Sequence, residues 1–239
     1  PFKMVKLFVA LVAATFAVAT ANLSSPISTP SSLQDLKLSR PGGLINRLRG
    51  GAAFVEKVTG LSFSDTLSAD GKSLKFVGAG DRKKAIIGPV AVNVYAVGLY
   101  VDETAAKATA ASTPDDAKTA ILDGTFTRSL KIVMARSVPS KKIGDALAEQ
   151  IEPRVKGTDA PLDKFKSFFQ GMQQLDKENE IIFTASGDTL AVQGPSGSQE
   201  FASKHLCNAI FDIYLGDDPV STNGKKSMLD GFVALCLSG

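Results

Sequence analysis

The uncharged segment at residues 89–101, PVAVNVYAVGLYV, constrains the fold of this chain most strongly. Apolar residues fill both sets of alternating positions: Val90, Val92, Val94 and Ala96 in one set, and Ala91, Val97, Leu99 and Val101 in the other. A strand that is apolar on both faces is covered on both faces, so it belongs in the interior of a sheet. The rest of the chain therefore has to supply neighbouring strands and packing layers for this segment.

The remaining segments predict a mixture of strands and helices. Turn signals at Thr59-Gly60 and Asp70-Gly71 predict an opening hairpin. Further strands are expected at residues 74–87, 126–135, 180–185 and 189–193, and helices at residues 113–122, from Pro139, from Pro161, and at residues 199–214 and 222–237. This order predicts an α+β fold, in which helices are layered on one side of a single antiparallel sheet.

The first part of the chain is typical of targeting segments. Residues 1–21 contain a short apolar run between lysines and the small residues Ala19-Thr20-Ala21, which indicates a signal peptide that is too short to span a bilayer. Residues 22–53 are rich in Ser, Thr and Pro and then in Arg and Gly, as in a transit peptide. Such a bipartite leader resembles those of algae with secondary plastids. We expect a plastid location, with the secretory pathway as the alternative, and a folded domain at residues 54–239 without a transmembrane segment.

Charge and composition exclude several classes of function. The formal net charge is +3, but six of the 27 basic residues and one of the 24 acidic residues lie in the first 54 positions. The folded part is therefore slightly acidic, and no nucleic-acid partner is expected. One His and two Cys are too few for a His/Cys metal centre, so no metal is expected. Cys207 and Cys236 are either free thiols, which we favour, or one bridge between helices.

Two glycine-containing motifs carry no catalytic signal. Gly78-Ala79-Gly80 opens like a dinucleotide fingerprint, but position 83 is Lys and no helix follows. Ser196 has Ser198 where a nucleophile elbow needs a glycine, so Ser196 is interpreted as a turn residue. His205 has no partner at helical spacing, so a surface or structural role is expected. No cofactor and no catalytic residue is predicted.

Polar side chains in apolar strands are the most informative signal for function. Asn93 and Tyr95 share one face of the central strand by simple alternation, and Arg82 lies in the strand before it. A buried arginine is unfavourable unless an anion meets it. From spacing alone, Arg82 either pairs with an internal carboxylate, lies at the margin of the sheet, or waits for an anionic ligand.

Several segments together resemble the chalcone isomerase fold family. The run VGAGDRKKAIIGPVAVNVYAVGLYVD at residues 77–102 is similar to the stretch where a GxGxR turn precedes a strand ending in (A/V)(I/V)GxY. The sequence IYLGDDPVS at residues 213–221 resembles the turn between the last two helices, and Val58-Thr59-Gly60 with Phe63 resembles the opening strands. The resemblance implies an open-faced β-sandwich, in which a large antiparallel sheet is covered by a helical layer and the ligand cleft lies between them.

The resemblance also implies roles for single residues. The family contains chalcone–flavanone isomerases, non-catalytic flavonoid helper proteins and plastid fatty-acid-binding proteins. Its cleft arginine falls on Arg82, and Tyr95 stands where isomerases have Thr and the fatty-acid-binding branch has Tyr. The other isomerase groups, Tyr, Lys, Asn and Thr, fall near Ile143, Ala146, Gln150 and Ile213. The polar groups that hold a chalcone are thus mostly missing.

These matches predict non-catalytic binding of a fatty acid or a similar apolar carboxylate by a monomer. Arg82 offers a planar fork for the carboxylate and Tyr95 a hydroxyl donor. Asn93, Ile143 and Tyr214 complete the expected ligand-binding set. The acyl chain would be lined by helix residues that serve equally as plain core, namely Ile143, Leu147, Phe165, Phe168, Phe169, Ile210 and Tyr214. The alternatives are a chalcone–flavanone isomerase and a helper protein that binds other enzymes.

Overall fold

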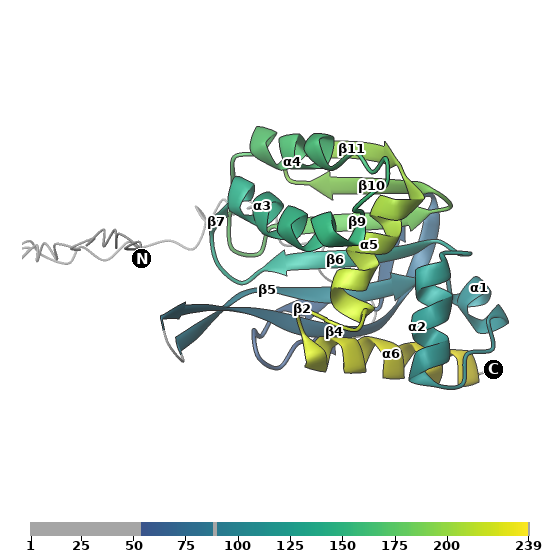
Figure 1. Ribbon diagram of the computed structural model, residues 1–239. Coiled ribbons are helices and arrows are strands. Elements are labelled where there is room, and N and C mark those ends of the chain that lie inside the picture. The colour runs from purple at the N-terminus through teal and green to yellow at the C-terminus, as the bar shows by residue number, and fades with distance from the viewer. Residues whose placement is uncertain (1–53, 88–89, 239) are drawn as a thin grey trace, which may run out of the picture. The chain divides into compact units, whose positions relative to one another are not determined.

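The computed structural model describes residues 54–87 and 90–238 (Figure 1). The predicted signal peptide at 1–21 and the transit-like segment at 22–53 lie outside the described residues. No helix in the described part combines the length and the apolar character that a membrane crossing requires.

One antiparallel sheet organises the domain. Its seven strands follow the order β11-β10-β9-β6-β5-β4-β3, and two short pairs, β1 with β2 and β7 with β8, lie beside it. The strands are β1 (Phe54–Val55), β2 (Ser62–Phe63), β3 (Thr66–Ala69), β4 (Lys72–Ile87), β5 (Val90–Val101), β6 (Arg128–Met134), β7 (Val138–Pro139), β8 (Gln174–Leu175), β9 (Glu180–Ser186), β10 (Thr189–Gly194) and β11 (Gly197–Ala202). β5 has a partner on each side, β6 and β4, so its predicted interior position is confirmed.

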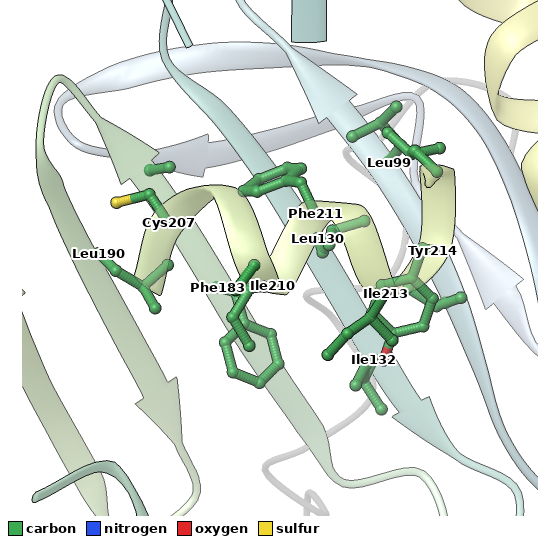
Figure 2. Close-up of a cluster of buried hydrophobic side chains, with 14 of the residues drawn as sticks. Leu99, Leu130, Ile132, Phe183, Leu190, Cys207, Ile210, Phe211, Ile213 and Tyr214 are labelled. Carbon is green, nitrogen blue, oxygen red and sulfur yellow. The ribbon is translucent and has the colours of Figure 1, made fainter. Parts of the chain in front are cut away.

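The helices gather on one face of this sheet (Figure 1). They are α1 (Glu103–Ala108), α2 (Pro114–Asp123), α3 (Ser140–Ile151) with the following 3₁₀ turn η2 (Glu152–Arg154), α4 (Leu162–Gly171), α5 (Lys204–Leu215) and α6 (Thr222–Leu237). Figure 2 shows α5 across the strands, with Ile210, Phe211 and Tyr214 packed over the sheet residues Phe183, Leu130 and Ile132. The predicted α+β architecture, an antiparallel sheet under a helical layer, is therefore confirmed.

Both faces of β5 are buried, each in a different core. Val97, Leu99 and Val101 belong to the larger core between sheet and helices. Ala96 and Tyr100 belong to a smaller core on the opposite face, which residues Leu61 and Phe63 of the opening segment help to cover. Burial of both faces therefore explains why β5 is apolar on both faces, as the sequence indicated.

Two differences from the sequence prediction concern β11 and α1. Residues 199–202 belong to β11 and pair with β10, whereas a helix was expected from residue 199. Only Phe201 of this edge strand is buried, so the segment has little apolar alternation by which a strand is recognised. Helix α1 was not predicted; Asp102 caps it by accepting a hydrogen bond from the backbone N–H of Ala105.

Glycines allow α6 to lie directly against β4. A Cβ at Gly78 would come 2.5 Å from the backbone oxygen of Ser227, and one at Gly80 would overlap the Cα of Gly224. A Cβ at Gly231 would overlap the carbonyl oxygen of Val77. Gly78 and Gly80 lie within β4 rather than in the turn that the family resemblance implied. Their role is close packing of backbone against backbone.

Arg128 is completely buried, and within residues 54–87 and 90–238 no carboxylate pairs with it. Its Nη2 reaches the side-chain oxygen of Asn208 at 3.4 Å, and its guanidinium lies 4.5 Å from the ring centre of Phe211. Nε and Nη1 have no hydrogen-bond partner among the described residues. Burial lowers the pKa of Arg128 to about 10, which still leaves the group charged at neutral pH.

We expect Arg128→Met to leave the free energy of unfolding unchanged or to raise it by about 1–2 kcal/mol, because methionine fills similar space without burying a charge. Urea denaturation measures the change. The matched control is Arg154→Met, which removes the arginine paired with Asp212 at 2.7 Å and is expected to destabilise. A loss of more than about 1 kcal/mol in Arg128→Met would contradict the prediction and show that its donors are satisfied.

Neither cysteine forms a disulfide within the described residues. Cys207 is buried on α5 and Cys236 is partly buried on α6, and both are free. The favoured alternative of two free thiols is therefore confirmed. Burial raises the pKa of Cys207 to about 11, so this thiol is protonated at neutral pH. His205 is exposed on α5, as a surface role predicts.

Candidate functional site

Arg82 and Tyr95 face each other across the β4–β5 pair. Arg82 is the direct partner of Tyr95 in the antiparallel register. Directly opposed residues project to the same face of a sheet with their Cβ atoms about 5 Å apart. That face is the helix-covered one, since Tyr95 belongs to the larger core. The two residues that sequence analysis singled out are thus brought together by strand pairing.

A β-bulge at Val94 decides which side chains of β5 reach this face. The register steps from Arg82↔Tyr95 to Lys83↔Asn93, which leaves Val94 as the extra residue. Val92, Val94 and Tyr95 all line the cavity described below, while Asn93 donates to the carbonyl oxygen of Val58 at 3.4 Å. The prediction that Asn93 shares the face of Tyr95 is wrong, because strict alternation is broken by the bulge.

A cavity of about 560 Å³ opens between the β4–β5 pair and α3, within the size range of ligand pockets in proteins. Its lining is largely aliphatic. The lining residues are Arg82, Lys84, Val92, Val94, Tyr95, Arg136, Ser137, Val138, Pro139, Lys142, Ile143, Ala146, Leu147, Glu149, Gln150, Ile213 and Val220. A cleft between sheet and helices was expected, and the structure places it at one end of the helical layer.

The guanidinium of Arg82 lies in this cavity without a protein counter-ion. Its Nη1 donates to the carbonyl oxygen of Val220 at 3.3 Å, in the loop between α5 and α6. No carboxylate of the described residues lies within ion-pair distance of it. The side chain is half-buried, which leaves it partly screened from water and open to the cavity. Of the alternatives left open by the sequence, pairing with an internal carboxylate is therefore wrong.

Tyr95 and Tyr214 form a buried pair of hydroxyl groups. Their oxygens lie 3.0 Å apart, and the two side chains are almost completely inaccessible to water. Burial raises the pKa of both, so both are protonated at neutral pH. A pair of hydroxyls uses one hydrogen between its oxygens and leaves one free. Of the two, only Tyr95 lines the cavity, so Tyr214, which was predicted to contact a ligand, instead contacts Tyr95.

Helix α3 supplies the apolar wall of the cavity opposite the strands. Ile143 and Leu147 lie four residues apart on its buried face, and Ala146 lines the cavity beside them. These residues come from the helix that sequence analysis expected after Pro139. The predicted contact of Ile143 with the cavity is present in the structure.

The positions that the resemblance matched to isomerase groups all meet at this cavity. Ile143, Ala146, Gln150 and Ile213 each line it. Three of the four are apolar, so the cavity lacks the hydroxyl and amine groups that isomerases have there. Gln150 is the single polar residue at these four positions.

Most of the residues considered as tunnel lining belong to the core instead. Phe165, Phe169 and Ile210 are fully buried among other apolar side chains and do not line the cavity. Phe168 packs against the same core. For these residues, plain core packing is the role that the structure supports.

The cations at the mouth of the cavity were missed in the sequence analysis. Lys84, Arg136 and Lys142 are exposed side chains from β4, from the loop after β6 and from α3. The three residues are far apart in the sequence, so it does not indicate that they form a cluster. Taken singly, each has the character of an ordinary solvent-exposed residue. Glu149 is the only acidic residue of the lining. Elsewhere in the described part, no group of three His, Cys, Asp or Glu side chains is arranged to hold a metal ion.

Comparison with known proteins shows the relationship of this chain. Residues 55–230 match the family model described as "Chalcone isomerase-like". The chain belongs to the chalcone isomerase-like family. It is 26% identical over 200 residues to a protein named Fatty-acid-binding protein 1 from Arabidopsis thaliana, an alignment that covers 76% of this chain and 71% of that protein.

The fold of a solved family member agrees with the architecture described above. The crystal structure of an Arabidopsis thaliana fatty-acid binding protein is similar with a TM-score of 0.68 and 22% sequence identity. The match covers 78% of this chain and 100% of the crystallised chain. At this identity the likeness establishes the fold, in agreement with the expected open-faced sandwich of sheet and helices.

Proposed function

We propose that this protein binds a fatty acid or a similar apolar carboxylate and catalyses no reaction on it. The observation that carries the proposal is Arg82, a guanidinium with no counter-ion among the described residues, which lies beside a hydroxyl donor in a cavity with aliphatic walls and a polar mouth. A carboxylate would pair with this guanidinium, and a hydrocarbon chain would pack against the aliphatic walls of the cavity. The similarity to a protein named for binding fatty acids supports the same ligand class.

The two ends of such a ligand contribute differently to its binding. Hydrogen bonds to charged groups contribute about 1.5–3 kcal/mol each. Each buried methylene contributes about 0.8 kcal/mol, so a long chain gives on the order of 10 kcal/mol. Association itself costs roughly 4–15 kcal/mol. The acyl chain therefore sets the affinity, while Arg82 and Tyr95 set the orientation of the ligand.

The apolar positions of α3 and α5 argue against catalysis. An intramolecular addition needs groups that bind and move protons at the reacting atoms. Ile143, Ala146 and Ile213 have no such groups, and the one acidic residue of the lining, Glu149, is exposed. The cavity is thus equipped to hold an anion and a chain but poorly equipped for proton transfer.

Lipid extraction of the purified full chain tests the proposal. Mass spectrometry of an organic extract is expected to find a free fatty acid in amounts approaching the protein, and a delipidated sample is expected to bind added acid by calorimetry. Absence of extracted lipid together with absence of binding by added acids of several chain lengths would refute the proposal. Rapid consumption of a chalcone, followed by absorbance, would contradict the non-catalytic part.

We expect Tyr95→Phe to weaken binding of a fatty acid about tenfold to hundredfold, since one hydrogen bond to a charged carboxylate contributes about 1.5–3 kcal/mol. Titration calorimetry measures the change. Tyr214→Phe serves as the matched control, because its hydroxyl contacts Tyr95 and not the cavity. We expect a smaller loss for this variant. Equal affinities of Tyr95→Phe and the parent protein would remove Tyr95 from the proposed site.

A further inference from the structure

The paired ends of β4 and β5 project beyond the rest of the sheet (Figure 1). β6 pairs with β5 only as far as Tyr95↔Met134, whereas β4 and β5 stay paired out to Ile87↔Val90. We call residues 83–87 and 90–93 the β4–β5 arm. A two-stranded ribbon is at best marginally stable by itself in water. Contact with another surface would therefore stabilise the arm.

The composition of the β4–β5 arm is apolar apart from a basic pair. Lys83 and Lys84 are its only charged residues, and Asn93 is its only other polar residue. Ala91, close to its end, is exposed. Apolar residues beside lysines are typical of segments at a membrane interface, where hydrocarbon enters the headgroup region and the ammonium groups stay at the phosphates.

Lys84, Arg136 and Lys142 form a basic collar at the mouth of the cavity. All three are exposed, and none has a carboxylate within ion-pair distance in the part of the chain that the structure describes. The single acidic lining residue, Glu149, does not balance them. β7 and the start of α3 lie on the side toward which the arm projects (Figure 1). Cations and apolar arm are therefore adjacent.

We propose that the basic collar and the β4–β5 arm together form a docking surface for an anionic lipid bilayer. A bilayer with anionic headgroups matches both features, because it offers negative charge to the collar and an apolar layer to the arm. An acidic protein would match the collar alone. The proposal rests on the surface around the cavity and stands whether or not the cavity holds a fatty acid. Docking in this way turns the cavity mouth toward the membrane.

Vesicle binding with hydrogen exchange tests the proposal. The full chain is mixed with vesicles of phosphatidylcholine or of equal parts phosphatidylcholine and phosphatidylglycerol, and amide exchange is followed by mass spectrometry. We expect the anionic vesicles to slow exchange in peptides that cover residues 83–93 and 136–143, and neutral vesicles to have little effect. Protection is expected to fade with added salt, since the Debye length falls from about 10 Å at 0.1 M to about 3 Å at 1 M.

Charge-matched variants separate the collar from the rest of the chain. Each cation near an anionic surface is worth about 1 kcal/mol, or roughly fivefold. The combined variant Lys84→Gln, Arg136→Gln, Lys142→Gln is therefore expected to lower partition onto anionic vesicles about 100-fold. The control is Lys164→Gln, Lys156→Gln, Lys204→Gln, which removes three exposed lysines that do not line the cavity. We expect this control to lose much less binding.

A second pair of variants tests the arm without changing the collar. Ala91→Glu places an acid on an exposed position of the arm and is expected to weaken vesicle binding about fivefold or more. Ala91→Gln, of the same size, is expected to weaken it much less. Arg82→Ala is expected to lose fatty acid and still bind vesicles, so failure of the two proposals can be distinguished.

Three outcomes would overturn the docking proposal. The first is equal binding of anionic vesicles by the collar variant and its control. The second is vesicle binding without protection at the collar and the arm. The third is protection of the same peptides by soluble polyglutamate but not by anionic vesicles, which would assign the surface to an acidic protein.

Discussion

Arg82→Ala is expected to lower the affinity for a fatty acid by about tenfold to hundredfold, because it removes the cation that is paired in register with Tyr95. The loss corresponds to one charge-assisted hydrogen bond at about 1.5–3 kcal/mol. Calorimetry with a delipidated protein measures it. Because no carboxylate pairs with the guanidinium, the variant loses only one hydrogen bond to the Val220 carbonyl and is expected to stay folded.

A fatty alcohol of the same chain length isolates the contribution of the charge. The parent protein is expected to prefer the acid over the alcohol, and Arg82→Ala is expected to bind both equally. Arg82→Lys keeps the charge but loses the planar fork, so an intermediate affinity is expected.

Lys142→Ala is the matched control, since it removes one charge from the cavity mouth and not from the site beside Tyr95. It is expected to reduce affinity only a few fold through weaker steering of the anion. If Arg82→Ala and the parent bind the acid equally while Lys142→Ala does not, the carboxylate lies at the mouth and the proposed orientation of the ligand is wrong.

Gly231→Ala is expected to destabilise the domain by about 3 kcal/mol or more, although alanine favours helices by about 1 kcal/mol over glycine. The new Cβ would overlap the carbonyl oxygen of Val77 on β4. Neither backbone can give way locally, so α6 must move off the sheet and take Phe232 and Met228 with it. Urea or thermal unfolding measures the loss.

Gly171→Ala is the control for this substitution. Gly171 is the last residue of α4, and a Cβ there meets no atom within 4 Å. Its replacement is expected to leave stability unchanged or slightly raised. Equal stability of Gly231→Ala and the parent would show that α6 adapts to the sheet at no measurable cost, and that the glycines are not required for its packing.

Local features of the sequence were sufficient for the fold class and for the two central residues of the site. In β5, apolar residues fill both sets of alternating positions, which indicates that both faces of the strand are buried. This pattern can be recognised because it involves only residues that are adjacent in the sequence. Arg82 and Tyr95 stand out because polar groups in apolar strands are costly to bury without a partner. The apolar residues Ile143, Ala146 and Ile213 could be recognised as replacements only through the resemblance to the chalcone isomerase fold family.

The family's motif drew attention to two glycines but assigned them to a turn, whereas they lie within β4. Gly78 and Gly80 are conspicuous in the sequence, but the adjacent residues do not indicate which segment packs against them. Ser227 and Gly224, which they approach, lie far along the chain on α6. Close packing between distant segments leaves no local pattern beyond the small residue itself.

Only the tertiary structure decided which polar groups reach the cavity. Alternation put Asn93 beside Tyr95, but the bulge at Val94 turns Asn93 to the other face. A bulge is set by how two strands fit together, so the sequence of one strand does not reveal it. Tyr214 meets Tyr95 across 119 positions of the chain, and the basic collar joins three separate elements. The sequence by itself determined features that depend on adjacent residues, such as apolar patterns and polar groups within them. The tertiary structure decided which residues distant along the chain lie in contact, because no local pattern encodes such contacts.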